Sequence, residues 1–301
     1  MREKKDMEFG KTPLLNDVDW SLPADDPLSL EFLGRRPAAG ETQIRLGTPA
    51  WGHKEWVGKI YPPGTKAIDY LSFYAKNFAT IELNTTHYRI PTAEQVRTWV
   101  SKVPESFLFC PKIPQSISHS AGGLTDAAEL RRWLESIAHF GPHLGPCFLQ
   151  LPPTFSDVRK AELFHFLKSW PDDLPLSLEL RHPCWFEEGR VRPALTRYLQ
   201  SRGIGLVITD VAGRRDVLHT SISADFVLLR FIGNNLHESD FTRCQAWSER
   251  LAQWSRRGLK EIFFFVHEPD DVSAPEMANQ VIRDLNDTTG AGLPPLQWVS
   301  C

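Results

Sequence analysis

Short apolar runs recur along most of the chain, and longer, more polar stretches separate them. Eight of these runs are rich in Val, Ile, Leu and Phe: residues 44–47, 79–84, 107–112, 147–151, 176–181, 205–210, 226–231 and 262–268. Continuous apolar runs of this length are typical of strands that are buried on both faces. The sequence therefore predicts eight strands.

The stretches between the runs follow a helical period instead. In residues 125–140, apolar side chains recur every three or four positions: Leu130, Trp133, Leu134, Ile137 and Phe140. Such spacing places them on one face of a helix. Residues 241–257 repeat the pattern, whereas residues 211–225 show no convincing helical period.

The alternation of strands and helices favours one architecture. Eight strands and about seven helices in roughly 250 residues match a single (β/α)8 barrel, a TIM-like α/β fold, over residues 44–301. We expect the unit at residues 211–225 to lack its helix. A doubly wound open sheet is the main alternative, but no GxGxxG turn follows the first strand. Residues 1–43, rich in Pro, Asp and Gly, predict a partly irregular N-terminal extension.

The second predicted strand contains a carboxylate where a core residue is expected. Side chains alternate along a strand, so when Ile81 and Leu83 point toward the helices, Glu82 and Asn84 point into the barrel. A carboxylate buried there costs several kcal/mol unless it is paired, hydrogen-bonded or protonated. The sequence therefore predicts that Glu82 has partners or a function.

Polar side chains also mark the ends of other predicted strands. The same alternation on the fifth strand turns Glu179 and Arg181 inward. Further strand-end candidates are Lys112, Gln150, Asp210, Arg230, His267 and Glu268. Barrel enzymes carry their active sites at the carboxyl ends of the strands. We therefore expect the functional site at this mouth of the barrel.

Composition narrows the range of partners and compartments. The chain is 42% hydrophobic with a net charge of -3, so nothing global attracts it to nucleic acid or to an anionic membrane. Its five scattered cysteines include no CxxC pair, which predicts reduced thiols. The first residues are charged, and no run approaches the roughly 18 apolar residues of a membrane span. We expect a cytoplasmic protein without membrane contact.

Five ordered segments of the chain resemble a known family. They are GTPAW (47–51), ELNTTHYRIPT (82–92), FCPKIPQSISH (109–119), LQLPP (149–153) and LELRHPCW (178–185). The chain is similar here to the YecE-like family of uncharacterised barrel proteins, also called domain of unknown function 72. The resemblance implies a barrel fold, and the family has no settled activity to transfer.

The resemblance covers most of the candidate residues but not all of them. Matching positions are Trp51, Glu82, Asn84, Lys112, His119, Glu179, Arg181, His182 and Arg230. His267 and Glu268 stand where the family tends to end its last strand with paired asparagines. The chain also reads RFIGNN at residues 230–235, where the family often has a histidine after the arginine. The part of the site on the last strand therefore departs from the family pattern.

The charges at the mouth favour an enzyme that acts on a small anionic compound, phosphorylated or carboxylated. In this hypothesis Arg181, Arg230 and Lys112 hold the anion. The catalytic candidates are Glu82, Glu179, Asp210 and His267, with Glu82 or Glu179 moving a proton. The other candidate substrate-binding residues are Trp51, Asn84, Tyr88, His119, Gln150, His182 and Trp185. A hydrolase, lyase or isomerase without a cofactor fits this set.

Three alternatives remain open at this stage. A divalent metal held by Glu179, Asp210 and His267, with Glu82, would suit a sugar-isomerase-like or endonuclease-like enzyme, although Arg230 would oppose the ion. A protein that binds nucleic acid or another ligand without catalysis would use the basic, aromatic segments 87–89, 181–185 and 213–215, against the acidic balance. The charges would otherwise form an ion-pair network that only holds the strands together.

Overall fold

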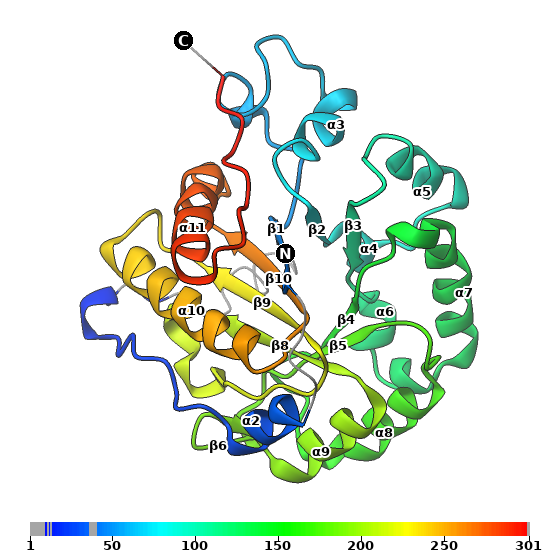
Figure 1. Ribbon diagram of the computed structural model, residues 1–301. Coiled ribbons are helices and arrows are strands. Elements are labelled where there is room, and N and C mark those ends of the chain that lie inside the picture. Colours follow the sequence, from blue (N-terminus) through cyan, green and yellow to red (C-terminus); the bar gives the residue numbers. More distant parts are fainter. Residues whose placement is uncertain (1–9, 11, 13, 36–40, 300–301) are drawn as a thin grey trace.

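A six-stranded parallel sheet forms the centre of the computed structural model, which describes residues 10, 12, 14–35 and 41–299 (Figure 1). The sheet order is β1 (Gln43–Gly47), β10 (Glu261–His267), β9 (Phe226–Ile232), β8 (Gly205–Asp210), β5 (Leu176–Glu179) and β4 (Cys147–Gln150). A separate parallel pair consists of β2 (Thr80–Leu83) and β3 (Leu108–Pro111). A short antiparallel hairpin consists of β6 (Phe186–Glu187) and β7 (Arg190–Val191).

The β2–β3 pair lies between β1 and β4, and only a few isolated backbone hydrogen bonds join it to each side within the described residues. The Glu82 N–H donates to the Thr48 carbonyl at 3.1 Å, next to β1. The Ile113 N–H donates to the Phe148 carbonyl at 3.0 Å, next to β4. Within the described residues no continuous ladder crosses either junction, so the sheet is not closed. The expected barrel is therefore confirmed only as an α/β fold around a parallel sheet.

Strand length and proline explain these interruptions. β2 and β3 have four residues each, which leaves few groups for pairing on a second edge. Pro111, at the end of β3, has no N–H to donate. Pro152 and Pro153 follow β4 after one residue and end its pairing in the same way. Lys112 and Phe148 consequently form only an isolated bridge.

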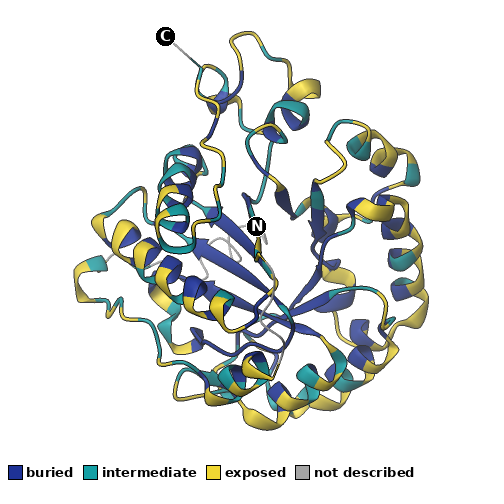
Figure 2. Ribbon diagram, in the orientation of Figure 1, coloured by how far each residue is buried: buried dark blue, intermediate teal, exposed yellow. Residues whose placement is uncertain are grey.

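Helices surround the strands and turn their apolar faces inward, which Figure 2 shows as buried inner and exposed outer faces. The α-helices are α2 (Pro27–Gly34), α3 (Tyr70–Tyr74), α4 (Thr85–Tyr88), α5 (Ala93–Val100), α6 (Gln115–Ser118), α7 (Ala127–Ile137), α8 (Lys160–Ser169), α9 (Pro193–Arg202), α10 (Glu238–Arg256) and α11 (Ala274–Thr289). Residues 211–225, all of them described, contain only the 3-10 helix Ala212–Val217, as the sequence predicts.

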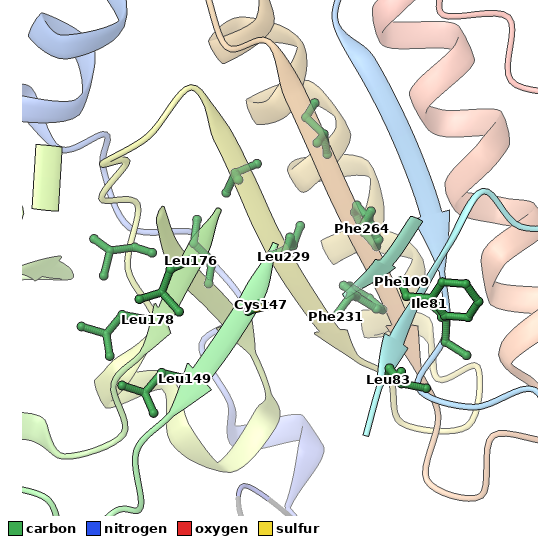
Figure 3. Close-up of a cluster of buried hydrophobic side chains, with 14 of the residues drawn as sticks. Ile81, Leu83, Phe109, Cys147, Leu149, Leu176, Leu178, Leu229, Phe231 and Phe264 are labelled. Atoms are coloured by element: carbon green, nitrogen blue, oxygen red, sulfur yellow. The ribbon is translucent and has the colours of Figure 1, made fainter. Parts of the chain in front are cut away.

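Alternation along the strands produces two apolar clusters. The outer cluster packs between strands and helices, and Figure 3 labels ten of its side chains, among them Ile81, Leu83 and Leu178. The inner cluster consists of Cys110, Phe148, Val207, Ala224, Phe226, Leu228, Phe263 and Phe265. Glu82 is in register with Cys110, and Arg230 is in register with Phe265, so both belong to the inner side. The charged candidates therefore lie beside the inner cluster, nearer the carboxyl ends of the strands.

The described part of the N-terminal extension is tied to the rest of the molecule. Asp26 accepts a hydrogen bond from the Leu28 N–H at the start of α2 and another, at 2.7 Å, from the Ser221 hydroxyl. Leu33 of α2 is fully buried in the outer apolar cluster. This packing gives the extension a structural role that its irregular sequence does not predict.

Two further observations concern the cysteines and the membrane. Cys110, Cys147, Cys184 and Cys244 are free thiols, in agreement with the sequence, and Cys301 lies outside the described residues. Among the described residues, no helix combines the length and the apolar character needed to cross a membrane.

We predict that Leu33→Ala lowers the free energy of unfolding by about 2–5 kcal/mol, because it removes a fully buried side chain and leaves a cavity. Leu14→Ala is the matched control in the same extension, because Leu14 is 63% exposed. Its cost should stay within about 0.5 kcal/mol. Urea denaturation of both variants measures the difference. Equal costs would show that the extension is not packed on the domain in solution.

Candidate active site

The Arg230 guanidinium on β9 lies between two buried carboxylates from other strands. Its Nε and Nη2 donate to the two carboxylate oxygens of Glu82 on β2, at 2.8 and 3.0 Å. Its Nη1 donates to both oxygens of Glu179 on β5, at 3.1 and 3.2 Å. All three side chains are at least nine-tenths buried. One cation therefore links three strands that are distant in sequence.

A second arginine extends this arrangement beyond the end of β5. Arg181 donates from Nε to Glu179 at 2.7 Å and from Nη2 to the Gln150 side-chain oxygen at 2.6 Å. Gln150 ends β4, which is in register with β5. The two arginines thus hold Glu179 from two directions.

Two further side chains complete the arrangement around Glu82. The Asn84 amide donates to one carboxylate oxygen at 2.8 Å, and the ring Nε2 of His267 lies 2.9 Å from the other. Together with Arg230 they satisfy both oxygens of Glu82. We call the whole set the mouth network: Glu82, Asn84, Gln150, Glu179, Arg181, Arg230 and His267.

The arginines keep both carboxylates ionised. Burial alone would raise the pKa of Glu82, but Arg230 and His267 outweigh it and hold that pKa well below its usual range. Burial acts on Glu179 in the same way, and Arg181, Arg230 and Lys112 lower its pKa to about 2. At neutral pH neither group carries a proton to give, and each is a weak base. This environment suits a role in positioning the arginines better than one in moving a proton.

A cavity of about 640 Å³ opens above the mouth network. Its lining includes Asn84, Tyr88, Lys112, Gln150, Arg181, Thr209, Arg230, His267 and Glu268. Gly10, Thr12 and Leu15 of the N-terminal extension also line it. Most of the candidates that the sequence places at strand ends therefore share one cavity.

Lys112 is the cation in this cavity that the carboxylates do not hold. Its side chain is almost completely buried, and no described residue hydrogen-bonds to its ammonium or forms an ion pair with it. The Phe148 ring centre lies 6.0 Å from its Nζ. Burial, then the neighbouring Arg230 and Arg181, lower the pKa of Lys112 to about 7. A substantial fraction of the side chain is therefore a neutral amine at neutral pH.

Glu268 is a carboxyl group of this cavity that can hold a proton. It is 4% exposed, and one of its oxygens accepts from the Asn235 N–H at 2.8 Å. The other oxygen has no hydrogen-bond partner among the described residues. Burial, followed by the nearby charge of Asp240, raises the pKa of Glu268 to about 7. The carboxyl group packs against Gly233, where a Cβ would collide with it.

The sequence interpretation placed Glu268 at a strand end without giving it a catalytic or binding role, and it did not select Thr209. The departure from the asparagine pair of the family was the available clue to Glu268. Thr209 lines the cavity, and its hydroxyl has no hydrogen-bond partner within the described chain. The same holds for the side-chain nitrogen of Gln150. Three buried residues at one cavity thus each have a polar atom without a partner.

Asp210 does not lie in the mouth network, contrary to the sequence interpretation. Thr209 faces the cavity, so its neighbour Asp210 takes the other side of β8. There Asp210 pairs with Arg215 and with Arg243, the latter at 3.0 Å, and accepts from the Trp247 ring N–H at 2.6 Å. Burial would raise the pKa of Asp210, but the two arginines lower it. The strand-end rule selected the wrong residue because it ignored alternation on β8.

The predicted aromatic contacts divide between packing and the cavity. Trp185 is buried, stacks on Phe155 and donates its ring N–H to the Phe155 carbonyl at 2.8 Å. Trp51 packs edge-on against Trp99, with ring centres 5.8 Å apart, and is not among the residues that line the cavity. Tyr88 lines the cavity and is 59% exposed. Among these three, only Tyr88 is placed to contact a ligand there.

The predicted histidines contact neighbouring residues. His182 accepts from the Cys184 N–H at 3.1 Å, at the start of a 3-10 helix. His119 lies 2.7 Å from the Ser118 hydroxyl through its Nδ1 and packs edge-on against His87. Neither histidine lines the cavity.

The structure separates Asp210 from the other metal candidates and pairs part of the basic surface with acidic side chains. Within the described residues, no three His, Cys, Asp or Glu side chains are arranged to hold a metal ion, and Asp210 lies apart from Glu179 and His267. In the basic segment 213–215, Arg214 pairs with Asp216 at 2.8 Å, and Arg215 pairs with Asp210. These acidic partners reduce the positive charge that the segment offers to a polyanion.

Comparison with known sequences identifies similar proteins. A family model described as a protein of unknown function, DUF72, matches residues 45–298. The UPF0759 protein YecE of Escherichia coli (strain K12) is 33% identical over 263 residues, which cover 81% of this chain and 93% of that protein. The UPF0759 protein YunF of Bacillus subtilis (strain 168) is 23% identical over 284 residues, with coverages of 84% and 98%.

Solved structures show the same fold. The crystal structure of a DUF72 family protein from Enterococcus faecalis V583 has a TM-score of 0.65 at 24% identity and covers 82% of this chain and 98% of that chain. A second, from Thermotoga maritima MSB8, has a TM-score of 0.61 at 22% identity, with coverages of 81% and 99%. Residues 10–35 of the extension precede the region that the family model matches.

We predict that Glu268→Gln changes how stability depends on pH. Glu268 has a pKa of about 7 in the folded protein against an ordinary value of 4.5, so between these values the folded protein binds more protons than the unfolded chain. Its contribution should therefore fall as the pH rises from about 4.5 to 7, by on the order of 3 kcal/mol in all. The difference between the wild type and Glu268→Gln should show this fall.

Urea denaturation at about pH 5 and about pH 7.5 measures the effect. Glu135→Gln serves as the control, because Glu135 is an exposed residue of α7. It should follow the wild type at both pH values. Parallel curves for Glu268→Gln and the wild type would mean that Glu268 is ionised like an ordinary surface glutamate.

Proposed function

We propose that this member of the DUF72 family, a family described as having unknown function, is an enzyme that acts on a small anionic compound. The compound would bind in the cavity of about 640 Å³ at the mouth network, which we call the mouth cavity. One observation carries this proposal. Lys112 and Glu268 line the same cavity, and their surroundings bring the pKa of each to about 7 from opposite directions. Groups that exchange protons at neutral pH need such pKa values.

The two groups have complementary roles in acid–base chemistry. Lys112 in its neutral form accepts a proton, while Glu268 in its protonated form donates one. Glu82 and Glu179 stay ionised and hold Arg181 and Arg230 in place. This assignment revises the hypothesis from the sequence, in which those two carboxylates move the proton. The reaction class stays a hydrolase, lyase or isomerase.

The charge balance favours a carboxylate over a phosphate as the anionic group. Lys112, Arg181 and Arg230 are three cations, and Glu82 and Glu179 are two anions, so these five groups together carry one positive charge when Lys112 is protonated. A carboxylate neutralises that charge, whereas a phosphate dianion exceeds it. The unpartnered donors of Gln150 and Thr209 support binding of the carboxylate oxygens.

The geometry also supports a barrel-like ring of all eight strands. Arg230 on β9 pairs with Glu82 on β2 and with Glu179 on β5, which lie in different sheets. The hydrogen bonds from Glu82 to Thr48 and from Ile113 to Phe148 bring the β2–β3 pair next to both edges of the large sheet. We infer that the mouth of this ring is the substrate site, as in barrel enzymes.

Thermal denaturation with small hydroxy acids tests the proposed function. Glycolate, lactate or glycerate at about 100 times its dissociation constant should stabilise the protein by about 2.7 kcal/mol. For a chain of this size that raises the Tm by several degrees, at about 2–4 °C per kcal/mol. Inorganic phosphate at the same concentration should raise the Tm less, because its second charge has no counterpart in the cavity.

Matched lysine variants locate the effect. Lys112→Met should abolish the rise in Tm that the hydroxy acids cause, since it removes the charge that the carboxylate neutralises. Lys168→Met should keep that rise, because Lys168 is an exposed residue of α8. A rise of the same size in Lys112→Met, or a larger rise with phosphate than with any hydroxy acid, would contradict the proposed site.

A further inference from the structure

The backbone of Lys112 is held firmly, while its amino group is left without a partner. The Lys112 N–H donates to the Leu83 carbonyl at 3.3 Å, and its carbonyl accepts from the Thr86 hydroxyl at 2.8 Å. The side chain is 8% exposed and lines the mouth cavity. Its ammonium has no hydrogen bond or ion pair within the described part of the chain. A buried ammonium without a partner is costly and loses its proton readily.

The charges around Lys112 act against the ammonium form. The groups that face it are Arg181, Arg230, Glu82, Glu179 and His87. The two arginines repel the ammonium directly, and they bind the two carboxylates that would otherwise stabilise it. Burial, together with Lys112 itself, lowers the pKa of His87 to about 3, so this ring is neutral as well. A buried lysine beside other cations is a recognised form of activated amine nucleophile.

We propose that Lys112 is a nucleophile that forms an imine with the oxo carbon of a small 2-oxo acid bound in the mouth cavity. This inference rests on the proposed function and names its substrate class. The cavity, with a volume of about 640 Å³, has room for such a ligand beside the amine. Lys112 lies open to this cavity, as bond formation to a bound ligand requires.

The step balances with the groups at hand. The lone pair of the neutral Lys112 amine attacks the oxo carbon, a C–N bond forms, and a proton passes from nitrogen to the former oxo oxygen. Glu268, which lines the same cavity, then protonates that oxygen, and the C–O bond breaks to release water. The products are a protonated imine, one water molecule and the Glu268 carboxylate. No oxidant or reductant takes part.

The ligand carboxylate matters for the charge of the product. The protonated imine keeps a positive charge next to Arg181 and Arg230, and Glu82 and Glu179 supply two negative charges against these three positive ones. A carboxylate on the ligand supplies the missing negative charge. A neutral ketone cannot do so, and we expect it to react more slowly for this reason.

Reductive trapping tests the inference. The protein is incubated with pyruvate and cyanoborohydride at about pH 7, and the modified lysines are identified by peptide mass mapping. Because an ordinary lysine with a pKa near 10.4 holds less than about 0.1% free amine at this pH, we expect Lys112 to react at least about tenfold faster than exposed Lys168. Acetone in place of pyruvate should modify Lys112 more slowly than pyruvate does.

Lys112→Arg keeps a cation at this position and should abolish the fast modification, while the slow reaction of the exposed lysines continues. Equal rates at Lys112 and Lys168 in the wild-type protein would overturn the inference, and this comparison does not depend on how any variant folds. Fast modification that persists in Lys112→Arg would overturn it as well.

The outcomes separate this inference from the proposed function. Hydroxy acids cannot form an imine, so their effect on the Tm reports only on carboxylate binding. Stabilisation by glycerate that depends on Lys112, without fast trapping of pyruvate, would overturn the imine and keep the proposed function. Fast, selective trapping at Lys112 without stabilisation by any hydroxy acid would support the imine and count against the carboxylate site.

Discussion

The ion pair of Arg230 with Glu82 and Glu179 is the interaction on which the site depends. Three buried charges are held at the carboxyl ends of three strands, in a region where an unpaired charge would be too costly to keep. The pairing fixes how β2, β5 and β9 lie relative to one another at the mouth. It also uses the carboxylates fully, because Arg181, Asn84 and His267 fill their remaining positions.

The chemistry of the cavity follows from this use of the carboxylates. Lys112 lies among charges that are already matched to one another, and no described residue pairs with its ammonium. Burial, then Arg230 and Arg181, lower its pKa to about 7. Burial and the charge of Asp240 raise the pKa of Glu268, and no arginine of the mouth network pairs with this carboxyl group. In the proposed function the strongly paired groups therefore serve as scaffold, and the poorly paired groups are the reactive ones. A count of charged residues at strand ends does not distinguish the two.

The sequence predicts the inward residues well where one strand supplies a clear alternation. Ile81 and Leu83 flank Glu82, and the structure places them on the outer side with Glu82 inside. The helical pattern of residues 125–140 is confirmed by α7, in which Leu130, Trp133 and Ile137 are buried. Position at a strand end is a weaker guide, because Asp210 ends its strand but lies on the side of β8 that faces away from the cavity. The break in the sheet beside β3 also depends on register, which periodicity does not specify.

The sequence does not predict which charged side chains pair with one another across the strands. Glu82 and Arg230 are 148 positions apart, and nothing in either segment indicates that one arginine binds both glutamates. The pKa values of Lys112 and Glu268 depend on those pairings, so the sequence could not separate the reactive groups from the structural ones. The titration of Lys112 tests this account most directly, by NMR of protein with isotope-labelled lysine and with Lys112→Arg to assign the signal. The account predicts a pKa of about 7, and a value near the ordinary 10.5 would contradict it.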